Sequence, residues 1–69
     1  MKIYSIQASE NVLLVTAKKA RAVQKVQDFI GAPESEVRHL LLRAKRLGLM
    51  MVVFSNELGA TVSIQIWEE

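Results

Sequence analysis

Cysteine is absent from this chain of 69 residues, so the protein forms no internal disulfide and has no thiolate metal site. A single histidine without other strong ligands does not make a conventional zinc site, so we expect no bound metal and no cofactor. The longest apolar run, residues 47–54, is about half the length that crosses a bilayer. The amino terminus alternates polar and apolar residues, which argues against a signal peptide. We therefore expect a cytoplasmic protein that does not bind membranes.

Catalytic motifs are missing as well. The sequence contains no phosphate-binding loop, no nucleophile elbow, and no serine or threonine with a placed histidine–carboxylate pair. A chain this short is expected to form one domain, residues 1–69, with little volume for a substrate pocket. Its core is small, because a domain of this size buries only about 60% of its unfolded surface. We therefore expect a binding protein rather than an enzyme, stabilised in part by forming a homodimer.

Charge is distributed unevenly along the chain. Residues 16–48 carry eight basic and three acidic side chains, whereas the remaining residues carry one basic and four acidic side chains. The central segment is therefore positive, although the net charge of the whole chain is only +2. This asymmetry indicates an anionic partner for the central segment.

The central segment has the pattern of two amphipathic helices. Thr16 is a suitable N-cap for a helix over residues 17–30. Pro33 suits the first turn of a second helix over residues 33–47. A glycine follows each predicted helix as its expected C-cap. The side chains expected to be buried by the two helices are Ala20, Val23, Val26 and Ile30, and Val37, Leu40, Leu41, Ala44 and Leu47.

Strands are expected on both sides of the helices. Residues 2–7 are rich in β-forming side chains, and residues 50–54 and 60–67 predict a hairpin around a turn at residues 55–59. The methionines that begin this hairpin are expected in the core. The two terminal strands are expected to provide a dimer contact as well, because their apolar residues exceed what a small core needs. These residues are Tyr4, Ile6, Ile64 and Trp67.

Residues 12–15 are ambiguous. The segment Val-Leu-Leu-Val can pair with the first strand as a hairpin, or it can open a helix. A strand would give the order ββααββ, whereas a helix would complete a core of three helices.

One side of the second predicted helix carries an unusual mixture of groups. Ser35, Arg38, His39, Leu42 and Arg46 recur at steps of three and four residues, which places them on one face. Guanidinium, imidazole and hydroxyl groups around a lone leucine are typical of a surface that contacts a partner. That partner can be DNA or another protein.

The predicted elements follow one another in the order of a known family: a helix that ends at Gly31, a second helix, the exit Gly48-Leu49 and a hairpin. Together, residues 23–67 resemble a winged helix-turn-helix DNA-binding domain. Val23, Val26, Ile30, Val37, Leu41 and Leu47 occupy its apolar positions. The resemblance implies an α+β fold, a small winged helix-turn-helix with an extra amino-terminal strand and a carboxy-terminal wing. A ββααββ two-layer domain is the alternative.

The resemblance implies sequence-specific binding of duplex DNA by a small transcription regulator, of the size that phages, plasmids and archaeal viruses encode. The recognition helix, residues 33–47, would lie in the major groove. Base contacts are then expected from Ser35, Arg38, His39 and Leu42. Phosphate contacts are expected from Lys18, Lys19, Arg21, Lys25, Arg43, Lys45 and Arg46.

The alternative function is binding to an acidic protein partner. A compact ββααββ protein of the kind that phages use to inhibit host machinery would use the same basic helical face to hold an acidic surface or to block a nucleic-acid site. A strand at residues 12–15 favours this alternative, and a helix there favours DNA binding.

Overall fold

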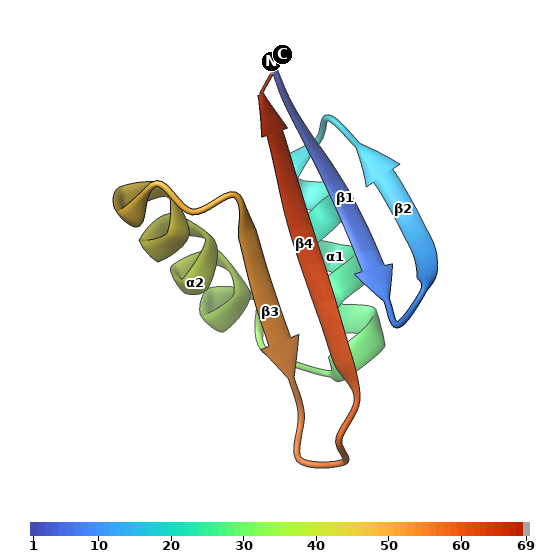
Figure 1. The fold of residues 1–69 in the computed structure, drawn as a ribbon. Helices are drawn as coiled ribbons and strands as arrows, with labels where there is room; N and C mark the ends of the chain where they lie inside the picture. The colour runs from blue at the N-terminus through green and yellow to red at the C-terminus, as the bar shows by residue number, and fades with distance from the viewer. Residues whose placement is uncertain (69) are drawn as a thin grey trace.

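A computed structural model describes residues 1–68 as one antiparallel sheet with two helices (Figure 1). The strands follow the order β2-β1-β4-β3, so the first and last strands of the chain lie side by side in the middle of the sheet. The elements, in chain order, are β1 (Lys2–Ala8), β2 (Asn11–Thr16), α1 (Lys19–Ile30), α2 (Glu34–Leu47), β3 (Met51–Ser55) and β4 (Thr61–Glu68).

The predicted α+β class is confirmed, and the succession of two helices and a hairpin has the winged-helix-like layout. Residues 12–15 belong to strand β2, so the element order is ββααββ. The extra amino-terminal strand is the first arm of a hairpin, and β4 is a central strand rather than a free wing. No helix of residues 1–68 has the length and apolar character needed to cross a bilayer.

Helix boundaries follow from local hydrogen bonds. Thr16 belongs to β2 and its Oγ1 accepts the Lys18 N–H at 3.0 Å, so α1 begins at Lys19, two residues later than predicted. Gly31 and Gly48 end the two helices in the left-handed conformation, with φ of 73° and 71°. The predicted glycine C-caps are therefore confirmed.

The core lies between α1 and one face of the sheet. Ile6 of β1 and Ile64 of β4 are fully buried there beneath Val23 and Val26 of α1. The expected burial of Ala20 is wrong: Ala20 is exposed, and Ala22 takes the place in the buried stripe. α1 begins later than expected and is rotated so that Ala22 faces the sheet.

The predicted dimer contact through the terminal strands is wrong for most of its residues. Tyr4, Ile6 and Ile64 are buried because β1 and β4 pair with each other in the centre of the sheet. Only Trp67 of that group is exposed, at 56%. The free edges of the sheet are β2 and β3.

Helix α2 lies at the margin of the molecule, beside the free edge of β3 (Figure 1). Its buried residues are Val37, Leu41 and Ala44, and its backbone lies close to α1 and β3 but not to the other strands. Leu47 was expected to be buried but is 62% exposed, since no strand lies next to β3 to cover it. Met50 and Met51 are at least half exposed for the same reason, so their expected place in the core is also wrong.

Candidate nucleic-acid interface

The outer face of α2 consists of Ser35, Arg38, His39, Leu42 and Arg46. All five side chains are exposed, on the side of the helix opposite its buried residues. The prediction that these five residues share one exposed face of the helix is therefore confirmed. Pro33 and the capping Gly48 fix the two ends of this helix, so the five side chains are carried by a regular element.

One ion pair restrains this face. Nε of Arg38 donates to Oε1 of Glu34 at 3.0 Å, one helical turn earlier. Both side chains are largely exposed, so the pair is worth less than about 1 kcal/mol. No other lysine or arginine forms an ion pair with a carboxylate of residues 1–68, and the remaining cations of the helices are thus available to an anionic partner.

The structure brings two of the seven predicted phosphate-contacting residues together at one end of the molecule, in a pocket that Glu68 also lines. The start of α1 and the end of α2 meet there, and Lys19 and Lys45 line a common pocket of about 290 Å³. Lys2 of β1 lines the same pocket, although sequence reasoning did not select it. The pairing of Lys2 with Glu68 across β1 and β4 places it at this end, and no local sequence pattern reports such a pairing.

The other five predicted phosphate contacts, Lys18, Arg21, Lys25, Arg43 and Arg46, do not line this pocket. Lys25 is half-buried along α1, and Arg21 is exposed on the same helix. Arg43 lies on the flank of α2 that faces β3, where it shares a groove with Leu47 and Met51. The seven predicted phosphate residues therefore do not form one continuous stripe.

The turn of the hairpin carries no cation. Asn56 organises it: its Oδ1 accepts the N–H groups of Leu58 and Ala60, each at 3.0 Å, and its Nδ2 donates to the carbonyl oxygen of Ile30 at 3.3 Å. Leu58 at the tip is 93% exposed. The turn therefore presents an apolar tip held by an amide, rather than a basic wing.

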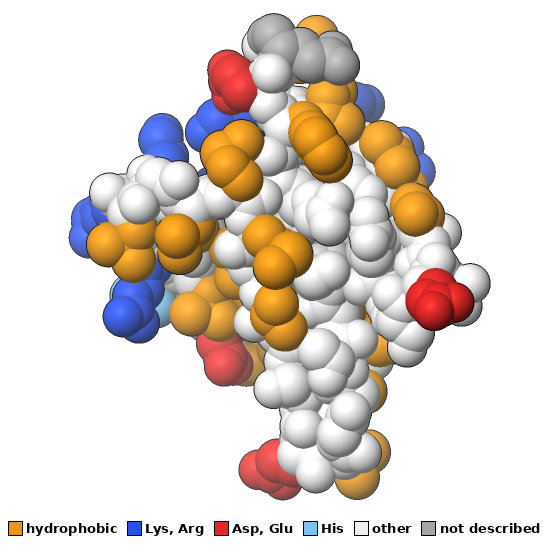
Figure 2. All heavy atoms as spheres, in the orientation of Figure 1, with side chains coloured by type: hydrophobic (Ala, Val, Ile, Leu, Met, Phe, Trp, Pro, Cys, Tyr) orange, Lys and Arg blue, Asp and Glu red, His pale blue; other side chains and the backbone are white. Residues whose placement is uncertain are grey.

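Sequence reasoning missed an apolar surface next to α2. Leu47, Leu49, Met50, Met51 and Val53 are each at least half exposed. Figure 2 shows hydrophobic side chains gathered over β3 and the neighbouring end of α2. The sequence predicts a buried strand over residues 50–54 and burial of Leu47, because the apolar pattern does not show that β3 lies at an edge of the sheet.

No group of three histidine, aspartate or glutamate side chains within residues 1–68 is arranged to hold a metal ion. Comparisons of the chain with protein-family models, curated proteins and solved structures give no match.

Proposed function

We propose that the protein binds duplex DNA through the outer face of α2. The observation that carries this proposal is the position of α2: its backbone lies at the margin of the molecule, close only to α1 and β3, and its five outer side chains are exposed. A helix placed in this way can enter a major groove without the sheet meeting the DNA backbone. Its partner α1 supplies cations from the same side of the sheet.

The proposed contacts follow from side-chain chemistry. Arg38 is suited to guanine, Ser35 and His39 to hydrogen-bonding base edges, and Leu42 to a thymine methyl group. The cluster of Lys19 and Lys45 at one end of the helical layer is suited to phosphates. We further propose that the protein acts as a small cytoplasmic transcription regulator, encoded by a virus or a plasmid. It would bind as a homodimer to two half-sites.

The experiment is selection of a preferred duplex from a random library, followed by titration of variants by fluorescence anisotropy. Arg38→Ala is expected to weaken binding by about 1–3 kcal/mol and to relax specificity at one base pair. Leu42→Ala is expected to weaken binding by about 1 kcal/mol through loss of apolar contact. Thr61→Ala, an exposed change on β4, is the control and leaves the affinity unchanged. If both α2 variants bind like the parent protein, the assignment of the outer face is wrong.

An acidic protein partner is the second candidate. It is favoured by the ββααββ order and the strand at residues 11–16, because a third helix of the DNA-binding layout does not form there. The same cations of α1 and α2 would then hold carboxylates. Absence of binding to any duplex at about 50 mM salt, where phosphate contacts are strongest, would favour this candidate.

A further inference from the structure

The outer edge of β3 presents unpaired backbone groups. The Ile66 N–H donates to the carbonyl of Met50 at 2.7 Å, and the Asn56 N–H donates to the carbonyl of Ala60 at 3.1 Å. Hydrogen-bonded residues alternate along an antiparallel strand, so Val52 and Phe54 also face β4. The N–H and C=O groups of Met51, Val53 and Ser55 therefore point away from the sheet. No residue from 1 to 68 outside β4 bonds to the backbone of these three.

The β3 edge lacks three of the features that usually prevent strand addition: charged residues, proline and a β-bulge. The sequence of β3, Met-Val-Val-Phe-Ser, contains no charge and no proline, and its pairing with β4 has no register shift. The other edge strand, β2, carries an irregularity in its pairing with β1, between Ile6 and Gln7. Such irregularities bend a strand and interrupt its edge. Strand addition is therefore favoured at β3.

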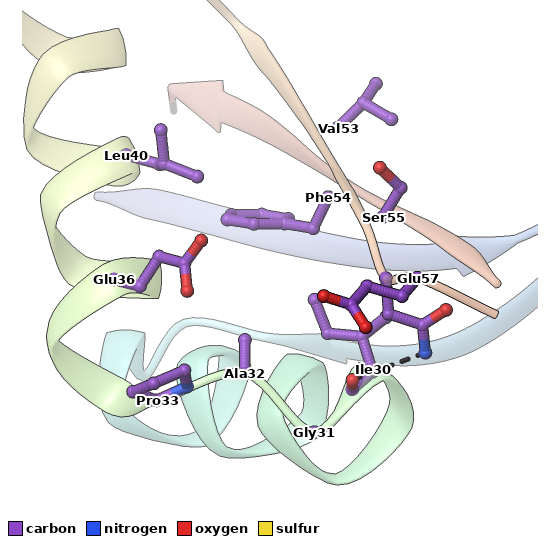
Figure 3. Close-up of a pocket in the computed structure, with 11 residues that line it drawn as sticks. Ile30, Gly31, Ala32, Pro33, Glu36, Leu40, Val53, Phe54, Ser55 and Glu57 are labelled. Atoms are coloured by element: carbon purple, nitrogen blue, oxygen red, sulfur yellow. Dashed lines mark hydrogen bonds between the residues drawn. The ribbon is translucent and has the colours of Figure 1, made fainter. Parts of the chain in front are cut away.

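A groove runs between this edge and α2. We define the edge groove by Glu36, Leu40, Arg43 and Leu47 of α2 and by the edge of β3 from Met51 to Ser55. Its two parts have volumes of about 640 and 260 Å³ and share Leu40 and Val53. Figure 3 shows Leu40 and Glu36 extending from α2 toward β3, while Val53 points away from α2. An added strand would thus lie against a helix flank that is apolar at Leu40 and Leu47 and charged at Glu36 and Arg43.

The two ends of the edge groove carry opposite charges. Arg43 lies at the end near Met51, where no acidic residue lines the groove. Glu36 and Glu57 lie at the end near Ser55, where no basic residue lines it (Figure 3). A strand antiparallel to β3 would place its amino end beside these glutamates and its carboxyl end beside Arg43. A parallel strand would place its carboxyl end beside the glutamates.

We propose that the edge groove binds an extended peptide segment of a partner protein, which adds to β3 as an antiparallel fifth strand. The segment is apolar at alternate positions, basic at its amino end and acidic at its carboxyl end. Backbone hydrogen bonds to Met51, Val53 and Ser55 hold the segment, and Leu40 and Leu47 receive its alternate side chains. This proposal does not depend on DNA binding by the outer face.

A second copy of this chain fits the edge groove less well than a single segment does. Two β3 strands paired about a twofold axis would bring both α2 helices to the same side of the joined sheet. Each α2 lies beside the free edge of its own β3, so the two helices would compete for the same space (Figure 1). An extended segment brings no helix with it and leaves α2 in place.

The test uses the full chain and two synthetic nine-residue peptides. The first reads Lys-Thr-Ile-Thr-Val-Thr-Ile-Asp-Glu, and the second has the same residues in reverse order. Binding of the first peptide is expected to slow hydrogen exchange at the amides of Met51, Val53 and Ser55, as measured by NMR. The amides of Val52 and Phe54 already bond to β4 and serve as internal controls. The reversed peptide is expected to bind about tenfold more weakly, because its charges oppose those of the edge groove when it adds antiparallel and match them only in the less stable parallel pairing.

Two pairs of variants test whether the peptide binds at the edge of β3 rather than elsewhere on the molecule. Val53→Pro removes one outward N–H and leaves the bonds to β4 intact, so it is expected to weaken peptide binding about tenfold. Val53→Ala keeps that N–H and is the matched control. Arg43→Glu is expected to abolish the preference for peptide direction, whereas Arg21→Glu on α1 is expected to leave it unchanged.

The outcomes discriminate between the proposals. Loss of peptide binding in Val53→Pro, with the circular dichroism spectrum and DNA affinity retained, supports a peptide site that is separate from the DNA face. Equal peptide binding by Val53→Pro and Val53→Ala would overturn the proposal. It would also be overturned if the amides of β3 became protected without peptide when the protein concentration is raised and a dimer forms. Failure of DNA binding in every variant would contradict the proposed function and leave the peptide result unaffected.

Discussion

Arg38 is the side chain with the most specific proposed role, and in the free protein Glu34 holds it at 3.0 Å. An exposed pair one helical turn apart contributes only a few tenths of a kcal/mol, so DNA can displace Glu34 from Arg38 easily. The carboxylate nevertheless lies at the start of α2, where a recognition helix approaches phosphates. If α2 binds DNA as proposed, Glu34 would act against nonspecific binding at this end of the helix.

Replacement of Glu34 tests this balance. Glu34→Gln is expected to raise DNA affinity severalfold, because it removes a negative charge and releases the Arg38 guanidinium. The free energy of unfolding is expected to change by less than about 0.5 kcal/mol. Glu10→Gln removes the same charge from the β1–β2 turn, at the opposite edge of the sheet from α2, and serves as the control. An equal gain in affinity from both variants would show that only net charge matters.

Ile64 and Val53 differ in burial, although both lie in the hairpin of β3 and β4. Ile64 is fully buried, so Ile64→Ala is expected to reduce the free energy of unfolding by about 2–5 kcal/mol. Val53 is 54% exposed, and Val53→Ala is expected to lose less than about 1 kcal/mol. Urea denaturation followed by circular dichroism measures both changes. Similar losses in the two variants would mean that Val53 is covered in solution.

Glycine residues end both helices, and the chain reversal after the second glycine positions α2 along the sheet. Gly31 and Gly48 both adopt positive φ and terminate helices of 12 and 14 residues. After Gly48, the Leu49 N–H donates to the carbonyl of Ala44 at 2.9 Å, which turns the chain back toward β3. This reversal places the flank of α2 along the free edge of β3 and thereby forms the edge groove.

Substitution of Gly48 measures how much stability depends on the left-handed backbone conformation at this position. A Cβ at Gly48 would meet no atom within 4 Å, so any loss of stability arises from the left-handed backbone alone. Gly48→Ala is expected to destabilise the protein by about 1 kcal/mol, and Gly48→Asn by less, because asparagine tolerates this conformation. For a domain of this size, 1 kcal/mol corresponds to a fall in melting temperature of about 4–8 °C. Equal melting temperatures for all three proteins would contradict this account.

The two layers of the molecule, the helices and the sheet, differ in charge and polarity. The helical layer carries most of the positive charge, and the opposite face of the sheet is uncharged at its centre. There, Gln7 Nε2 donates to Ser5 Oγ and to Gln65 Oε1, each at 3.3 Å. Apolar side chains lie toward the β3 edge of that face (Figure 2). A polyanion is therefore expected to meet the helices, and a peptide to meet the edge.

Salt dependence tests the helical layer as a whole. If about six phosphates are contacted, DNA affinity is expected to fall by about 10³-fold between 50 and 200 mM salt. Lys45→Gln is expected to lower the slope of log affinity against log salt by about one. Peptide binding at the edge groove relies on backbone hydrogen bonds and apolar contact, so it is expected to respond less to salt. A flat salt response with DNA would contradict phosphate contact by the helices.

The sequence alone determined the local structure: two helices ended by glycines, strands at both termini, and an outer face of α2 that is exposed as predicted. Those features depend on periodicity and capping, which act over a few residues. Only the tertiary structure decided the strand order, because the pairing of β1 with β4 joins residues at the two ends of the chain. That pairing buried Tyr4, Ile6 and Ile64 and left β3 at an edge, so the apolar residues that follow α2 became a surface rather than a core.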